Sequence, residues 1–387
     1  MVNEHVKEIS RLTSDMVKIP SVSSDPEGIA QIADFVKEWL GNNGITSKKV
    51  EYVKGFPVVV AQVGKGKGSV MLNGHMDVVN EGERSSWKHG PYSGRIDASG
   101  VYGRGTVDMK SGLAVQMHAF VELADKVDYR MVLTAVSDEE TGGTKCSKPL
   151  SEKYSPDLVL VAEPTRSELI VLGEKGVFWS KLTAKGRTAH ASTPSLGSNA
   201  IMLMMDDLRR LSALNKMKVR IPQETRDMVR VASEEFGSDA PRVSFNAGKI
   251  AGGLKPNVVA DRCELYADTR LPPGISVDRI FKLEREMARN CDVELVQASE
   301  PNYTSPSNKY ASEFIKVAKN CKSGMKTSIM TGGTDGRFFR YKGIPSITYG
   351  PGTMKLMHNY NEWVPFSQLD TAYKVYSSYL ERLNGYI

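Results

Sequence analysis

Apolar residues in the first half of the chain form short runs that alternate with segments of helical periodicity. The runs contain few polar residues, so they predict strands covered on both faces of a sheet. Apolar residues recur at helical spacing within 26–40, where Asp25-Pro26 supplies an N-cap and a first helical residue. A second helix is predicted at 111–125. The predicted strands of this half cover residues 56–63, 69–73, 130–137 and 157–162.

The pattern changes after Gly173. Two segments resemble strands with one polar face, 176–184 and 258–269, and helices are predicted near 197–212 and 276–290. Strand and helix then alternate again after Pro301, with predicted helices at 308–320, 334–341 and 366–383 and predicted strands at 326–330 and 344–348.

This order predicts one α/β domain with a mostly parallel mixed sheet, interrupted by an inserted α+β domain. The predicted catalytic domain comprises residues 1–174 and 300–387, and the insertion comprises residues 175–299.

The composition is that of a globular protein. Of 387 residues, 40% are hydrophobic and 25% are charged, which excludes a disordered, collagen-like or coiled-coil chain. The net charge of +6 comes without a dense basic run, so we expect no nucleic-acid partner. Four scattered cysteines indicate buried thiols in a reducing compartment. The polar N-terminus and the absence of an 18-residue apolar run predict a soluble cytoplasmic protein without membrane contact.

Acids and imidazoles follow the predicted strands at several points. Each group alone is more simply a surface pair or a solvated turn. Together they would meet at one edge of the sheet, where α/β folds place their sites. Carboxylate and imidazole ligands suit zinc, manganese or cobalt, so the pattern predicts a metal centre. The groups are His75 with Asp77, Asp138 to Glu140, Glu163, Asp108 in a glycine-rich loop, and His358.

Several motifs occur in a fixed order along nearly the whole chain: NGHMDVV, GVYGRGTVDMKSG, SDEETGG, VAEP, GRTAHASTPSLGSNAI, AGGLKPNVV and ADTRLPPG. As a set they resemble one metallohydrolase family. It includes acetylornithine deacetylase, succinyl-diaminopimelate desuccinylase, aminoacylase, and the glutamate carboxypeptidases and dipeptidases.

The resemblance implies two divalent metal ions in each chain, with zinc as the expected metal and cobalt or manganese as alternatives. His75 and Glu163 would hold one ion, Glu140 and His358 would hold the other, and Asp108 would bridge both.

The resemblance also implies roles for residues beside the metals. Glu139 would be the general base and acid, and Asp77 would accept a hydrogen bond from the ring of His75. His190 would donate to the oxyanion across a dimer interface. The family often has a cis peptide bond after the bridging aspartate, which in this chain would be the bond between Asp108 and Met109.

Three further residues resemble substrate anchors. Arg270 and Asn257 would grip a substrate carboxylate, although Arg270 could instead form a structural pair with a neighbouring acid. Arg337 lies in TGGTDGRFFR, which is one residue shorter than the corresponding GGTSDGRF stretch of the desuccinylases. The other histidines, His5, His89 and His118, are expected to be structural or solvated.

The sequence therefore predicts a homodimeric, dinuclear amidohydrolase that cleaves an amide bond in a small substrate bearing a carboxylate. We expect N-acyl-amino-acid deacylation of the acetylornithine or succinyl-diaminopimelate type, with the insertion serving as a lid and dimerisation domain. A metallo-carboxypeptidase or dipeptidase acting on short peptides is the close alternative. A binding protein that has lost catalysis is the alternative from another class, and the complete set of site residues argues against it.

Overall fold

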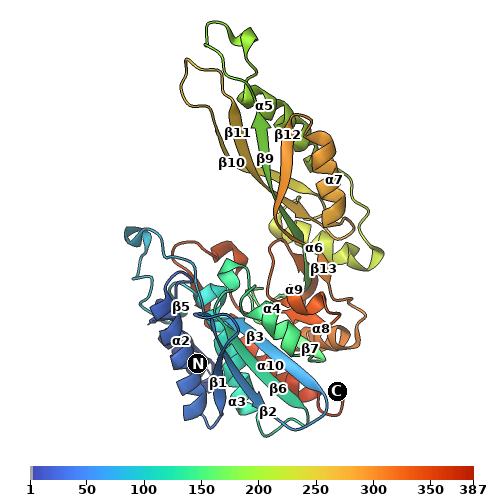
Figure 1. Cartoon of the computed structure of the whole chain (residues 1–387). Coiled ribbons are helices and arrows are strands. Elements are labelled where there is room, and N and C mark those ends of the chain that lie inside the picture. The colour runs from blue at the N-terminus through green and yellow to red at the C-terminus, as the bar shows by residue number, and fades with distance from the viewer. Residues whose placement is uncertain (1–2) are drawn as a thin grey trace. The chain divides into compact units, whose positions relative to one another are not determined.

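The computed structural model describes residues 3–387 and divides the chain into two compact units (Figure 1). Unit 1 contains the chain up to Leu172 together with Thr304–Thr327 and Thr334–Ile387. Unit 2 contains Gly173–Tyr303 and Ser328–Gly333. The insertion predicted at 175–299 falls inside unit 2, but the short segment Ser328–Gly333 joins that unit from beyond the expected second boundary.

Unit 1 is built on a mixed sheet whose centre is parallel. Its strands run in the order β1-β2-β6-β3-β7-β15-β8, and the pairs β6-β3, β3-β7 and β7-β15 are parallel. The flanking pairs are antiparallel, which confirms a mixed α/β sheet. The strands are β1 (Ser47–Glu51), β2 (Pro57–Val63), β3 (Ser69–His75), β6 (Arg130–Val136), β7 (Leu158–Val161), β8 (Leu169–Glu174) and β15 (Ser346–Thr348).

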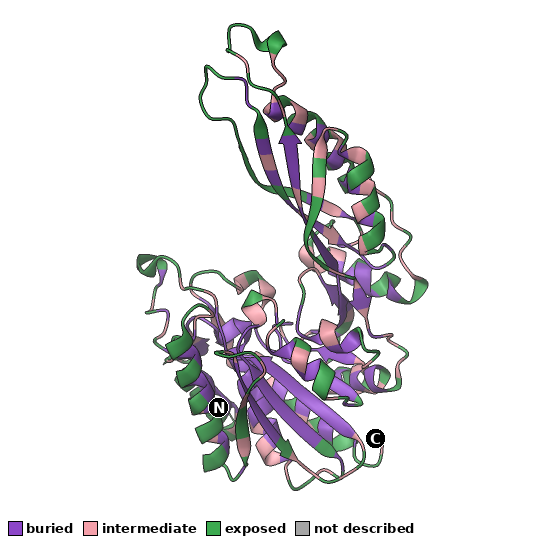
Figure 2. Ribbon diagram, viewed as in Figure 1, coloured by how far each residue is buried: buried purple, intermediate pink, exposed green. Residues whose placement is uncertain are grey.

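Helices cover both faces of this sheet, so its central strands are buried along almost their whole length (Figure 2). On one face Met71 and Val159 pack in a cluster with Leu150 of α4 and Phe339 of α9. On the other face α3 packs against β3 and β6, and α1 and α10 pack against α3. The helices are α1 (Glu4–Val17), α2 (Pro26–Asn42), α3 (Ser111–Glu122), α4 (Ser147–Lys153), α8 (Lys309–Cys321), α9 (Gly336–Arg340) and α10 (Phe366–Arg382).

The ends of these helices follow from local residues. Asn3 caps α1 by accepting a hydrogen bond from the amide of Val6, and Asp25 caps α2 ahead of Pro26. The helix predicted at 334–341 is shorter in the structure. It begins at Gly336, with Asp335 in the N-cap position, and ends at Arg340.

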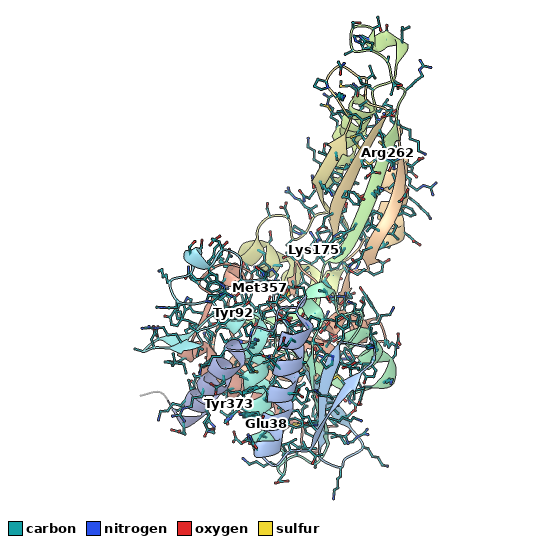
Figure 3. All side chains as sticks on the ribbon, turned by 60° about the vertical axis from the view of Figure 1, so that its left-hand side comes forward. Glu38, Tyr92, Lys175, Arg262, Met357 and Tyr373 are labelled. Atoms are coloured by element: carbon teal, nitrogen blue, oxygen red, sulfur yellow. The ribbon has the colours of Figure 1, made fainter. Side chains whose placement is uncertain are left out.

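Unit 2 contains a four-stranded antiparallel sheet in the order β10-β11-β9-β12 among the described residues. One face packs on a core formed by Phe178, Leu182, Leu265 and Ile280. Burial alternates along β11, as predicted for a one-faced strand, and Arg262, labelled in Figure 3, lies on the exposed face. The elements are β9 (Gly176–Lys185), β10 (Ser244–Gly252), β11 (Arg262–Leu271), β12 (Cys291–Ser299), α5 (Ala200–Leu211), α6 (Arg226–Phe236) and α7 (Val277–Met287).

Short strands complete the described fold. A small antiparallel sheet joins β16 (Trp363–Pro365), β5 (Gly100–Tyr102) and β4 (Arg95–Ile96). Both β13 (Asn302–Tyr303) and β14 (Lys326–Met330) pair with β8. No helix within residues 3–387 is both long and apolar enough to span a bilayer. Cys146 and Cys263 are buried as predicted, whereas Cys291, the first residue of β12, and Cys321, the last residue of α8, are only half-buried.

Candidate metal centre and active site

The acids and imidazoles singled out in the first half of the chain follow three neighbouring strands of unit 1. His75 ends β3, Glu139 and Glu140 open a short 3-10 helix after β6, and Glu163 comes two residues after β7. These three strands are adjacent and parallel, so their carboxyl ends meet at one edge of the sheet. Asp108 reaches the same edge from the turn Thr106–Lys110 that leads into α3.

The first group of side chains consists of His75, Asp108 and Glu163, all buried. Nε2 of His75 lies 2.9 Å from Oδ1 of Asp108 and 3.6 Å from Oε1 of Glu163. Its other ring nitrogen, Nδ1, donates to the backbone carbonyl of Asp77 at 2.8 Å. That hydrogen bond leaves Nε2 as the nitrogen that faces the carboxylates.

The second group consists of Asp108, Glu140 and His358. Nε2 of His358 lies 3.1 Å from Oδ2 of Asp108 and 3.0 Å from Oε2 of Glu140. His358 has a left-handed backbone (φ 59°), which is uncommon for a residue other than glycine. Asp108 therefore presents one carboxylate oxygen to His75 and the other to His358, as a bridging ligand would.

These residues fit a pair of divalent cations. Each group offers three ligand atoms within 4.8 Å of one another, all imidazole nitrogens or carboxylate oxygens. Oε1 of Glu140 is buried without a hydrogen-bond partner. Burial, followed by the charge of Asp108, raises the pKa of Glu163 well above its ordinary value. Bound cations would offset this repulsion and favour the ionised carboxylates.

The side chain of Asp77 contacts more than the ring of His75. Its Oδ2 accepts a hydrogen bond from Oγ of Ser23 at 2.8 Å and another from the amide of Glu140 at 3.3 Å. Its Oδ1 lies 3.5 Å from Nδ1 of His75, whereas the Asp77 backbone carbonyl lies closer and takes the hydrogen bond. The resemblance implies that Asp77 accepts a hydrogen bond from His75, and the atom that accepts it is the main-chain carbonyl of Asp77.

Glu139 lies beside the two groups and belongs to neither of them. Burial, and then the charge of Asp335, raises the pKa of Glu139 well above its ordinary value. A carboxylate with a raised pKa is better matched to proton transfer near neutral pH. Glu140 therefore lies close enough to His358 to share a metal ion with it, whereas Glu139 lies outside both groups and is available for proton transfer.

The turn that carries Asp108 is held by a buried ion pair that the sequence does not reveal. Glu362 pairs with Arg104 and accepts hydrogen bonds from the amides of Gly105 at 3.0 Å and Val107 at 3.3 Å. The peptide bond between Asp108 and Met109 is cis, as the resemblance implies. Glu362 and Arg104 are far apart in the chain, and no motif links them.

Arg337 is placed next to the turn that carries the two glutamates. Its guanidinium donates to the carbonyls of Thr334 at 2.9 Å and Gly142 at 2.6 Å. These contacts tie the start of α9 to the residues that follow Glu139 and Glu140. The structure shows Arg337 in contact with the main chain, and its role as a substrate anchor stays a prediction.

His190, Asn257 and Arg270 belong to unit 2. The first two are neighbours, because the amide of Ala191 donates to the carbonyl of Asn257 at 3.1 Å. The ring of His190 is exposed, and its Nδ1 lies 2.8 Å from Oγ of Ser192. Arg270 instead makes two hydrogen bonds of 2.8 Å to Asp268, which is the structural pairing that the sequence left open.

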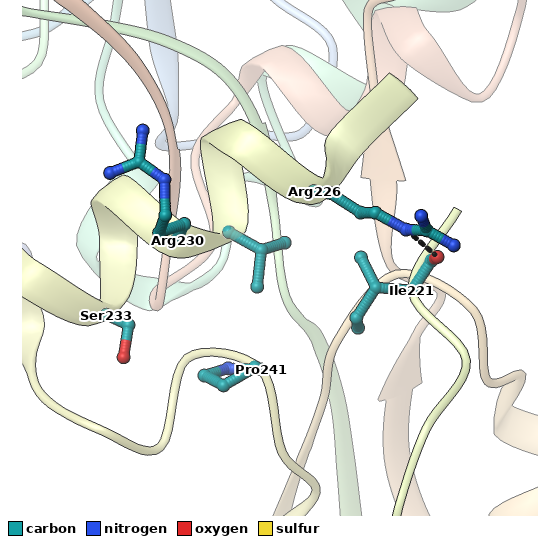
Figure 4. A pocket seen from close by; sticks show the side chains of 6 residues that line it. Ile221, Arg226, Arg230, Ser233 and Pro241 are labelled. Atoms are coloured by element: carbon teal, nitrogen blue, oxygen red, sulfur yellow. Dashed lines mark hydrogen bonds between the residues drawn. The ribbon is translucent and has the colours of Figure 1, made fainter. Parts of the chain in front are cut away.

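Unit 2 also has a pocket on its surface (Figure 4). In it Nε of Arg226 donates to the carbonyl of Ile221 at 3.4 Å. None of the predicted site residues lines the pocket, which is formed by Ile221, Arg226, Val229, Arg230, Ser233 and Pro241. Its lining has no carboxylate or imidazole, so it lacks the groups that metal binding needs.

Comparison with known proteins identifies the family. The profile of Peptidase family M20/M25/M40 matches residues 71–382. The chain belongs to this family. Membership confirms the resemblance drawn from the motifs, and it makes the chain a metal-dependent amidohydrolase.

Members with similar sequences align over almost their whole length. Acetylornithine deacetylase of Aliivibrio salmonicida is 26% identical, over 96% of this chain and 97% of that protein. A probable succinyl-diaminopimelate desuccinylase of Staphylococcus epidermidis is also 26% identical, over 96% of this chain and 98% of that protein.

Solved structures of other hydrolases share the fold. A metallo-carboxypeptidase from Sulfolobus solfataricus has a TM-score of 0.79 at 21% identity, and covers 98% of this chain and 99% of its own. A tripeptidase from Staphylococcus aureus has a TM-score of 0.77 at 22% identity, and covers 99% of both chains.

Proposed function

We propose that this M20 protein removes an acyl group from an N-acyl amino acid by hydrolysing the amide bond, with two zinc ions in each chain. The position of Asp108 carries the proposal, because its two oxygens lie 2.9 Å from His75 and 3.1 Å from His358. A carboxylate shared between two imidazole-containing groups is suited to a dinuclear centre. The remaining ligands would be Glu163 on one side and Glu140 on the other.

Two bound cations would polarise the scissile carbonyl and lower the pKa of the attacking water. Glu139 would take the proton from that water and deliver it to the departing amine nitrogen. Its position outside both ligand groups supports this role, since a carboxylate that binds a metal is a poorer proton acceptor. Asp77 would hold His75 through its backbone carbonyl, which fixes the ring with Nε2 toward the metal.

The substrate contacts are part of the same proposal. His190 would donate to the oxyanion, while Asn257, Arg270 and Arg337 would recognise the carboxylate of the substrate. For Arg270 this requires the guanidinium to exchange its contacts with Asp268 for contacts with the substrate. The homodimer and the cytoplasmic location stay predictions.

A peptidase acting on short peptides is the second candidate. The solved structures of similar fold support it, because those described above are a carboxypeptidase and a tripeptidase. The similar sequences support the deacylase, because a deacetylase and a desuccinylase align over 96% of the chain. The metal centre serves either reaction, so the choice depends on the groups that bind the acyl side.

A hydrolysis panel with zinc- and cobalt-loaded protein tests the proposal. It compares N-acetylornithine, N-succinyl-diaminopimelate, simple N-acyl amino acids and dipeptides, with product detection by mass spectrometry. We expect turnover of one or more acylated amino acids and little turnover of dipeptides. A preference for dipeptides would establish the second candidate. No turnover by protein with both metals bound would contradict both.

The variant Glu139→Gln separates proton transfer from metal binding. We expect it to keep its metal content and lose about 10²–10⁴-fold in turnover, the usual contribution of a general base. Glu38→Gln is the matched control, because Glu38 is exposed on α2 (Figure 3) and should leave turnover unchanged. Near-normal activity of Glu139→Gln would remove Glu139 from the mechanism.

A further inference from the structure

A second cluster of metal-ligating side chains lies outside the proposed active site, where three helices of unit 1 pack together. His5 comes from the first turn of α1, and His118 and Glu122 come from the second half of α3. Tyr373 of α10 lies against them. The sequence gives no reason to connect these residues, and it predicts only structural or solvated roles for the two histidines.

Three ligand atoms of this cluster form a triangle small enough for all three to bind one metal ion. Nδ1 of His5 lies 3.1 Å from Nε2 of His118 and 3.7 Å from Oε2 of Glu122. The third side, from Nε2 of His118 to Oε2 of Glu122, is 4.0 Å. The point equidistant from the three atoms is about 2.1 Å from each, which matches zinc–nitrogen and zinc–oxygen bond lengths.

The surrounding groups orient these ligands. The hydroxyl of Tyr373 donates to Oε2 of Glu122, and its ring stacks on His5 with centroids 4.6 Å apart. Oε2 of Glu8 lies 3.6 Å from Nδ1 of His118, the ring nitrogen that faces away from the triangle. A carboxylate beside the second nitrogen of a histidine ligand is a common arrangement in metal sites, because it orients the ring. Glu8 is also close enough to serve as a ligand with both histidines.

We propose that His5, His118 and Glu122 form a separate site for a borderline transition cation such as Zn²⁺, with Glu8 as an additional or supporting ligand. Two imidazoles and a carboxylate select zinc, cobalt, nickel or copper over magnesium and calcium. The side chain of His5 is 44% exposed, so water can reach the remaining coordination position.

The site is distinct from the catalytic centre. Asp108 precedes α3, which begins at Ser111 and ends at Glu122. At 1.5 Å per residue, Glu122 lies about 16 Å along the helix axis from Ser111. A cation bound here would join the first turn of α1 to the end of α3. It would stabilise the folded chain in proportion to the logarithm of its free concentration. This inference does not rest on the proposed function.

Counting bound zinc in untagged protein tests the site. Protein loaded with zinc is passed through gel filtration at micromolar free zinc and measured by elemental analysis. We expect wild type to retain one zinc ion per chain more than His5→Gln and His118→Ala, whose affinity at this site should fall about 100-fold or more. The result is a difference between variants, so it does not depend on how the catalytic centre is occupied.

His89→Ala is the matched control, because His89 lies in a loop against Tyr102 and is absent from the cluster. It should retain the wild-type zinc count. Turnover should be unchanged in His5→Gln, since the site is remote from the active centre. A zinc count in His5→Gln and His118→Ala equal to that of wild type would overturn the proposal. Displacement of the additional zinc ion of wild type by an equal concentration of magnesium would overturn it as well.

Amide hydrogen exchange supplies a second measurement in case His118→Ala loosens α3. Zinc should slow exchange across residues 4–10 of wild type and of His89→Ala, because the cation fixes the start of α1. His5→Gln, which alters a half-exposed side chain, should lose this protection without loss of folding. Equal protection by zinc in wild type and His5→Gln would also overturn the site.

Discussion

Asp138 offers a direct measure of how the active-site turn is held. Its carboxylate is fully buried and accepts hydrogen bonds from the amides of Lys145 at 2.7 Å and Cys146 at 3.1 Å. These bonds close the loop that begins with Glu139 and Glu140. Asp138→Ala would remove both acceptors and leave two amides without partners.

The expected cost follows from those two bonds. A hydrogen bond to a charged group contributes about 1.5–3 kcal/mol, so the loss of two is worth about 3–6 kcal/mol. Part of this cost is offset by the loss of a charge repulsion. Burial, and then the charge of Asp138, raises the pKa of Asp335 to about 7, so removing Asp138 relieves Asp335 of a nearby negative charge. We therefore expect Asp138→Ala to destabilise unit 1 by about 3 kcal/mol, and Asp138→Asn, which keeps one acceptor, by about half of that.

Guanidinium denaturation in the presence of a chelator measures the change without the contribution of bound metal. Hydrogen exchange of the amides of Lys145 and Cys146 reports the local opening. Asp97→Ala is the matched control, since Asp97 accepts from the amides of Ser99 and Gly100 in a surface turn. Its effect should be much smaller. A change below about 1 kcal/mol in Asp138→Ala would refute the hydrogen-bond argument.

Three further variants test other parts of the structure. His358→Ala should lose one of the two catalytic metals, and full occupancy by elemental analysis would contradict its assignment as a ligand. Gly112→Ala would place a Cβ atom 2.0 Å from the carbonyl oxygen of Ala162, so it should destabilise by about 3 kcal/mol or more in thermal or chemical unfolding. Burial raises the pKa of Glu284, whose carboxylate accepts from two buried hydroxyls. Folding therefore opposes its ionisation, and this penalty is absent below the unfolded pKa of 4.5 and grows as pH rises toward the folded pKa. Glu284→Gln should be more stable than wild type at pH 7 and not at pH 4, and an equal difference at both pH values would exclude a buried charge as its cause.

The fold was predictable where burial shapes the sequence. The central strands β3, β6 and β7 are buried on both faces, and each appears in the sequence as an apolar run within two residues of its observed bounds. The strands that the sequence missed include β10 and β12, which are mostly exposed edges of the sheet in unit 2. Their pairing with β11 and β9 fixes them as strands, and pairing between distant segments leaves no local pattern.

The candidate site shows the same division. Metal-ligating residues could be proposed because they follow strands whose ends must meet, as for His75 and Glu163. The groups that position them could not, because they are joined only by tertiary contacts. Glu362 reaches the turn of Asp108 from the far end of the chain. His5 and His118, 113 residues apart, gave no sign of proximity in the sequence.

Four buried acids of unit 1 illustrate two ways in which the fold accommodates a carboxylate. Asp138 and Glu362 direct their oxygens at main-chain amides, so the protein itself satisfies them. The oxygens of Asp108 and Glu163 face imidazoles instead, and one oxygen of each lies within 4.8 Å of the other. Hydrogen bonds from main-chain amides stabilise an ionised carboxylate without any metal ion. Carboxylates that lie close to one another stay ionised together only when cations are beside them. The first pair should therefore govern folding in the presence of a chelator, and the second pair should govern how much stability metal binding adds.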